Sequence, residues 1–119
     1  METLLKNQIT TDQAHEWNKR WRDAVKDGSI VKKELKNSFL YDRAEFEALL
    51  AEEGVSHIRV YMGVNENDEQ TTMLVGVKYD EATQTDEEIV NITPGNSGVF
   101  DLAKPCPPFC PKKSLILYP

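Results

Sequence analysis

Two cysteines separated by three residues, Cys106 and Cys110 in the stretch Cys-Pro-Pro-Phe-Cys, are the side chains best spaced to do chemistry together. Such a pair can form a local disulfide, supply half of a zinc site completed by a partner, or remain as packed thiols. A straight polyproline path would hold their Cα atoms roughly 12 Å apart. Because a disulfide needs Cα atoms within about 7 Å, it requires a turn at Pro107-Pro108 or a cis peptide.

Zinc binding by this pair would need two further ligands, and the C-x-x-x-C spacing differs from the C-x-x-C spacing of zinc knuckles. The two histidines of the chain, His15 and His57, lie far away in sequence. We therefore interpret Cys106 and Cys110 as structural, packed cysteines. A local disulfide and a zinc half-site are the alternatives, and no bound cofactor is expected.

The cysteines belong to a proline-rich C-terminal arm, residues 104–119, whose prolines fix much of the backbone before folding. Pro108-x-x-Pro111 followed by Lys113 has the form of a polyproline ligand with a basic anchor. The apolar run 115–119 must be covered, either as a last strand or docked tail of its own domain or by another protein. The arm predicts these partner-binding residues: Pro108, Phe109, Pro111, Leu115, Ile116, Leu117 and Tyr118.

A third group with chemical potential is His57, Arg59 and Tyr61, which alternate on the polar face of an expected strand. They would allow a small enzyme to work on an open sheet face. No combination of nucleophile, base and oxyanion donors accompanies them, so the catalytic interpretation ranks below the others.

Composition describes the body that must position these groups. The chain has 119 residues and a net charge of -6, and residues 44–103 carry thirteen acidic against two basic residues. An acidic body repels phosphate backbones, so we expect no nucleic-acid partner. No apolar run is long enough for a signal peptide or a membrane span, which predicts a cytoplasmic protein.

Two amphipathic helices are expected in the first half. Thr10 and Gln13 predict a capping box, and Asp27-Gly28 ends the helix that follows. A second helix is predicted to start after Asp42, which would cap it, and to end at residues 52–54. The segment 29–41 fits neither period and is expected to be extended, with some strand.

The second half changes to the period of two that indicates strands. Runs at 57–64 and 71–79 predict a hairpin, 89–93 a third strand after an acidic connection, and 99–102 a short fourth strand. We expect an α+β fold in which both helices cover the apolar face of a three- or four-stranded antiparallel meander. That face would carry the side chains of Ile58, Val60, Met62 and Val64.

The strand order and tail carry a resemblance. The runs Ile58-Arg59-Val60-Tyr61-Met62-Gly63 and Met73-Leu74-Val75-Gly76-Val77, followed by Phe100-Asp101 and the Cys-Pro-Pro-Phe-Cys stretch, resemble a group of small uncharacterised bacterial proteins with a C-P-P-x-C ending. The group has no assigned activity. The resemblance implies a bacterial cytosolic setting and a shared fold, and it points to no catalytic residue.

Together these features predict a single α+β domain at 1–103 followed by the C-terminal arm. The leading hypothesis is a non-enzymatic interaction or structural module that engages a protein partner, or a second copy of itself, through the arm. A thiol or metal protein using Cys106 and Cys110 is the second hypothesis, and a small enzyme on the sheet face is the third.

Overall fold

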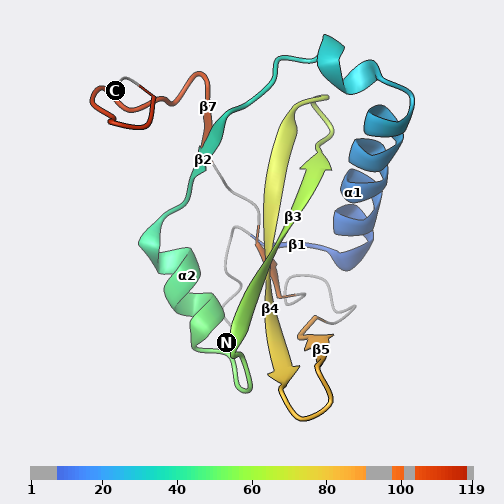
Figure 1. Cartoon of the computed structure of the whole chain (residues 1–119), viewed down its shortest axis with the longest axis vertical. Helices are drawn as coiled ribbons and strands as arrows, with labels where there is room; N and C mark the ends of the chain where they lie inside the picture. The colour runs from blue at the N-terminus through green and yellow to red at the C-terminus, as the bar shows by residue number, and fades with distance from the viewer. Residues whose placement is uncertain (1–7, 91–97, 101–103, 118–119) are drawn as a thin grey trace.

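The computed structural model describes residues 8–90, 98–100 and 104–117, and Figure 1 draws its helices on either side of a twisted sheet. The predicted α+β class is confirmed by two α-helices and antiparallel sheets. Within the described residues, the larger sheet has five strands, in the order β1 (Gln8–Ile9), β6 (Val99–Phe100), β4 (Gln70–Asp80) and β3 (His57–Val64), with β5 (Thr85–Glu88) also paired to β4. A second, two-stranded sheet pairs β2 (Ser38–Leu40) with β7 (Lys104–Cys106).

Helix α1, Thr11–Lys26, starts as its sequence predicts. The side chain of Thr10 accepts from the backbone N–H of Gln13, and the side chain of Gln13 accepts from the backbone N–H of Thr10, each at 3.0 Å. Asp27 is the C-cap, and Gly28 follows it in the left-handed conformation at φ 81°. Local signals therefore set both ends of this helix.

The segment 29–41, expected to be extended, begins with the 3₁₀ helix η1, Ser29–Lys32, and then forms β2, Ser38–Leu40. Helix α2, Arg43–Leu50, follows Asp42. The predicted side-chain cap is wrong, since the Asp42 side chain makes no capping hydrogen bond. The aromatic rings of Tyr41 and Phe46 meet edge to face instead, with centroids 5.9 Å apart.

The predicted hairpin is confirmed as β3, His57–Val64, and β4, Gln70–Asp80, paired from His57 opposite Val77 to Val64 opposite Gln70. The third strand was expected at 89–93. It is instead β5, Thr85–Glu88, inside the stretch interpreted as an acidic connection. The polar sequence of β5 resembles a loop, although two of its three acids, Asp86 and Glu88, bind Arg59.

The predicted antiparallel meander is present as the three consecutive strands β3-β4-β5, but the expected fourth strand does not continue it. Strand β6, Val99–Phe100, pairs with β4 beside β5 and also with β1, Gln8–Ile9. The centre of the sheet is therefore β4, which is bordered by β3 on one side and by β5 and β6 on the other. The rest of the expected fourth strand, and residues 91–93 of the expected third, lie outside the described residues.

The two helices cover opposite faces of the sheet, contrary to the expectation of a single apolar face (Figure 1). Trp17 of α1 packs with Met73, Val75 and Val99, while Leu49 of α2 packs with the alternate residues Leu74 and Phe100. Strand β4 is apolar on both sides and is buried on both sides. Of the β3 residues expected in the core, Val64 is buried and Ile58 packs beside Leu74, whereas Val60 is 55% exposed on this edge strand.

The C-terminal arm begins as a strand. Strand β7, Lys104–Cys106, pairs with β2 so that Cys106 lies opposite Ser38. The backbone N–H of Asn37 extends this pairing by donating to the carbonyl of Cys106 at 2.7 Å. The first three residues of the arm are thus tied to the segment between the two helices.

Candidate functional site

Cys106 and Cys110 form a disulfide, with Cα atoms 4.6 Å apart. The peptide bonds that precede Pro107 and Pro108 are both cis, which is one of the two backbone paths that the spacing requires. The structure therefore contains the local disulfide rather than the unpaired cysteines favoured from the sequence. Both thiols are used in this bond, and the described part of the chain holds no group of three or more candidate metal ligands.

A buried lysine fastens the disulfide loop to the body. The ammonium group of Lys36, with its side chain only 2% exposed, donates to the carbonyl of Pro107 at 2.9 Å and contacts Glu34 at 2.6 Å. The backbone N–H of Lys36 donates to the side chain of Gln70 at 3.1 Å. These contacts connect the loop to the start of β4.

The C-terminal arm exposes apolar side chains both within the disulfide loop and beyond it. Leu115 is 89% and Ile116 92% exposed, and Phe109 is also exposed. The Ser114 hydroxyl accepts the backbone N–H groups of Ile116 and Leu117, which forms a turn, so residues 115–117 are not the last strand considered as an alternative.

The other predicted residues of the arm divide by exposure. Pro108 and Pro111 are exposed, and Leu117 is partly buried. Tyr118 lies outside the described residues. The most accessible apolar positions of the arm, Leu115 and Ile116, directly follow Lys112, Lys113 and Ser114 in sequence, which makes this segment both basic and apolar.

The sheet face covered in part by α1 carries a group of hydrogen-bonded polar side chains, which we call the Arg59 cluster: Arg59, Tyr61, Asp86 and Glu88. The guanidinium of Arg59 donates to Glu88 Oε2 at 3.0 Å and to Asp86 Oδ2 at 2.8 Å. The hydroxyl of Tyr61 donates to the same Oε2 of Glu88. Alternation places all four on one face, because Arg59 and Tyr61 are two residues apart on β3 and the two acids two apart on β5.

The pKa values of the two donors respond to these contacts. The pKa of Arg59 is raised, first by its hydrogen bond to Asp86 and then by that to Glu88. The pKa of Tyr61 is raised above 10.0, chiefly by its hydrogen bond to Glu88 and next by burial. Both shifts favour the protonated donor, so the cluster consists of a cation, a neutral phenol and their carboxylate acceptors.

His57, the third member of the predicted catalytic group, is separate from the cluster. Its Nδ1 lies 2.8 Å from the hydroxyl of Ser56, and its ring packs against Tyr79 with centroids 5.1 Å apart. The structure thus brings together Arg59 and Tyr61 with two acids, and leaves His57 near the start of β3.

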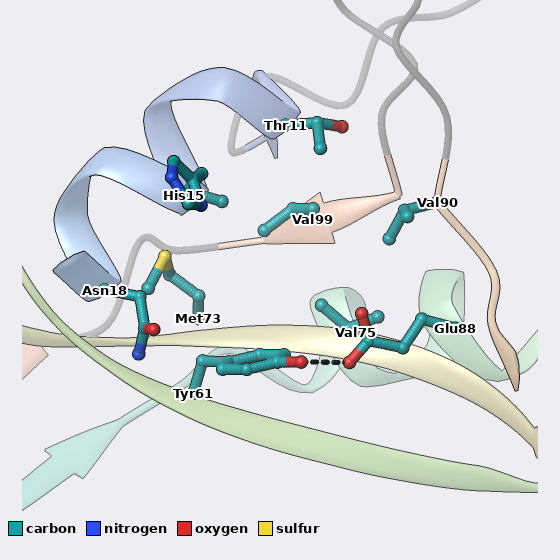
Figure 2. A pocket seen from close by; sticks show the side chains of 10 residues that line it. Thr11, His15, Asn18, Tyr61, Met73, Val75, Glu88, Val90 and Val99 are labelled. Atoms are coloured by element: carbon teal, nitrogen blue, oxygen red, sulfur yellow. Dashed lines mark hydrogen bonds between the residues drawn. The ribbon is translucent and has the colours of Figure 1, made fainter. Parts of the chain in front are cut away.

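A cavity of about 270 Å³ opens between α1 and the sheet, with Tyr61 and Glu88 on its wall (Figure 2). Its polar lining comes from Tyr61, Glu88 and three α1 residues, Thr11, His15 and Asn18. Apolar side chains form the rest of the lining: Ala14, Met73, Val75, Val90 and Val99.

Sequence reasoning missed Asp86, Glu88 and His15 as members of a site. The two acids were interpreted as part of a solvated connection, although their spacing of two, followed by Ile89, was an available signal for a strand with one charged face. His15 gave no such signal, because its position beside β4 and β6 depends on how α1 packs.

Comparison with family models, curated proteins and solved structures gives no match for this chain. Among the described residues, no helix combines the length and the apolar composition needed to cross a membrane. Because the comparisons give no match, the C-terminal arm and the cavity beside the Arg59 cluster are interpreted from their own geometry.

Proposed function

We propose that this protein is a non-enzymatic interaction module whose C-terminal arm binds the acidic body of a second copy of the same chain. The observation that carries this proposal is the exposure of Leu115 at 89% and Ile116 at 92%, next to Lys112 and Lys113. Contiguous exposed apolar side chains on an anchored segment are typical of interaction surfaces. The disulfide and Lys36 hold the start of the arm, which lowers the conformational entropy lost on binding.

Charge complementarity indicates which protein surface the C-terminal arm binds. The arm has three basic residues and no acidic ones, whereas residues 44–103 carry the large acidic excess of the chain. Opposite charges on the two surfaces favour encounter and orientation. A second copy supplies the acidic surface without any further component.

The body also offers apolar contacts on the side covered by α2. Leu50 at the end of α2 and Val60 on the edge strand β3 are both exposed. Val60 lies opposite Leu74, so it faces the same side of the sheet as α2. Two exposed acids lie on α2 and just after it: Glu47, which also pairs with Arg43 at 3.4 Å, and Glu53. We assign this side of the body as the receptor for the arm.

Sedimentation velocity across a wide concentration range tests the proposal. The full chain is expected to exceed its monomer mass of 13.6 kDa as concentration rises. The double variant L115D/I116D is expected to weaken dimerisation at least tenfold, since burial of one such side chain contributes about 1.5–3 kcal/mol. Raising NaCl from about 0.05 M to about 0.5 M should also weaken it, because salt screens the charge attraction.

The variant V31D is the matched control, since Val31 is 70% exposed but lies in η1, outside the arm and the assigned receptor. It should dimerise like the wild type. A full chain that stays monomeric at every concentration, or an L115D/I116D variant that associates as well as V31D, would reject self-association through the arm.

A further inference from the structure

The cavity beside Tyr61 has the size of a binding site for a small molecule. Engineered apolar cavities of about 150 Å³ bind benzene, and drug-sized ligands occupy roughly 300–1,000 Å³. At about 270 Å³, this cavity fits a ligand somewhat larger than a single aromatic ring. Its apolar lining comes from α1, β4, β6 and Val90, so the body of the ligand would contact hydrocarbon on several sides (Figure 2).

The carboxylate of Glu88 forms the polar end of the cavity, and its contacts involve one of its two oxygens. Glu88 Oε2 accepts from both Arg59 and Tyr61. Every hydrogen bond and ion pair that Glu88 makes to the described residues goes to Oε2, and its side chain is 28% exposed, so the second oxygen, Oε1, is open to a further donor. Figure 2 shows that this oxygen is turned away from Tyr61, toward the side where Val90 and Val99 lie. A ligand that donates a hydrogen bond could therefore bind to Glu88 without breaking the contacts already made.

The local charge favours a cationic donor. The Arg59 cluster holds two carboxylates, Asp86 and Glu88, against one guanidinium, so it keeps an excess negative charge. Of the ten lining residues none is a lysine or arginine. The ring of Tyr61 forms part of the wall, and an aromatic ring face attracts cations. The net charge of -6 adds a long-range attraction of the same sign.

We infer that this cavity binds a small primary amine in its ammonium form, carried on an aryl or branched alkyl body. The ammonium group donates to Glu88 Oε1 and lies beside the Tyr61 ring, while the body fills the space between Val75, Val90 and Val99. An ammonium has three donors and no acceptor, which matches a carboxylate whose existing contacts are all accepted ones. This site is separate from the arm and does not depend on self-association.

Titration of the full chain with phenethylamine, followed by calorimetry and by amide chemical shifts, tests the inference. Two probes of similar shape separate charge from size: 2-phenylethanol is neutral and 3-phenylpropionate is anionic. The amine should bind tightest, the alcohol more weakly and the anion not measurably. Shifted amides should include those of Tyr61, Val75 and Glu88. Equal binding of the anion, or no binding of the amine, would overturn the inference.

Variants of two neighbouring acids test whether Glu88 is the residue that binds the ammonium group. E88Q should weaken phenethylamine at least about tenfold, the equivalent of about 1.4 kcal/mol, because it removes the charge of the acceptor. The same substitution should change 2-phenylethanol binding less than about twofold, because Gln retains an acceptor oxygen. E87Q is the matched control, since Glu87 lies next to Glu88 on β5 but is exposed and stands opposite Lys78 in the β4–β5 pairing. Equal losses in E88Q and E87Q would reject Glu88 as the ammonium partner.

A second variant keeps the result interpretable if E88Q folds poorly. A14L retains Glu88 and Tyr61 and places a larger side chain in the cavity from α1, where leucine suits a helix. It should abolish binding of both the amine and the alcohol while the far-ultraviolet circular dichroism stays that of the wild type. Unchanged amine affinity in folded A14L would show that the amine binds elsewhere and would reject the cavity.

Discussion

The ammonium group of Lys36 donates a hydrogen bond of 2.9 Å to the carbonyl oxygen of Pro107, across a sequence separation of 71 residues. The lysine side chain is 2% exposed, so this contact is made away from water. It links the segment before β2 to the proline turn inside the disulfide loop. The position of the C-terminal arm therefore depends on an interaction between two residues that are distant in sequence.

Replacement of Lys36 by methionine should loosen this link. K36M removes the donor and leaves the Pro107 carbonyl without its partner, which should lower the free energy of unfolding by about 1–3 kcal/mol. K32M is the control, because Lys32 is exposed in η1. Urea denaturation measures the difference. Equal stability of K36M and K32M would show that the contact contributes nothing to folding.

Loss of the disulfide should destabilise the chain and weaken association through the arm. The double variant C106S/C110S opens a five-residue loop, for which the chain-entropy model gives about 2 kcal/mol. Urea denaturation with and without reductant measures the change in stability, and sedimentation velocity measures association.

Titration of free thiols in protein taken from a reducing cytoplasm tests whether the disulfide forms there. Two reactive thiols there would restore the sequence interpretation of unpaired cysteines, since disulfides persist mainly in oxidising compartments.

Close contact between α1 and β3 makes Gly63 sensitive to added volume. A Cβ at this position would lie 2.8 Å from Cε of Met73 and 3.2 Å from Cβ of Trp17. G63A should therefore cost about 1–3 kcal/mol through overpacking. The double variant G63A/M73L should recover part of the loss, because leucine lacks the terminal methyl that the new Cβ would meet. No recovery relative to the two single variants would assign the clash to Trp17 alone.

Features controlled by local sequence could be predicted. The capping box of Thr10 and Gln13 fixes the start of α1, and the alternation at 57–64 and 71–79 fixes the hairpin. The hydrogen bonds involved join neighbouring residues or strands connected by a short turn. Such signals are read within a window of a few residues.

Features controlled by contacts between distant residues could not be predicted. Strand β5 contains Asp86 and Glu88, whose partner Arg59 precedes them by 27 and 29 residues, so their sequence resembles a solvated loop. The apolar run at Met73-Leu74-Val75 is compatible with one or two buried faces. Only the placement of α1 and α2 on opposite sides decides between them.

Glu52 should make folding stability depend on pH in a defined direction. Burial raises its pKa above the ordinary 4.5, so the folded chain binds this proton more tightly than the unfolded chain. The free energy of unfolding therefore falls as pH rises from the pKa of Glu52 in the unfolded chain to its higher pKa in the folded chain, and it stays lower above that pH. E52Q should thus be more stable than wild type near pH 7, with a difference that shrinks at pH 3. Thermal unfolding at both pH values, with exposed E53Q as control, checks this, and a difference equal to that of E53Q would contradict it.

Tyr61 should ionise later than an ordinary tyrosine, and Glu88 should be the cause. Its pKa is raised chiefly by the hydrogen bond to Glu88, and this bond stabilises the fold while the phenol is protonated. The contribution is complete below the unfolded pKa of about 10 and is lost as pH rises through the higher folded value. Absorbance at the phenolate band should show a late component that Y61F removes and E88Q moves to lower pH. If E88Q leaves that component in place while Y61F removes it, then burial rather than Glu88 holds the proton on Tyr61.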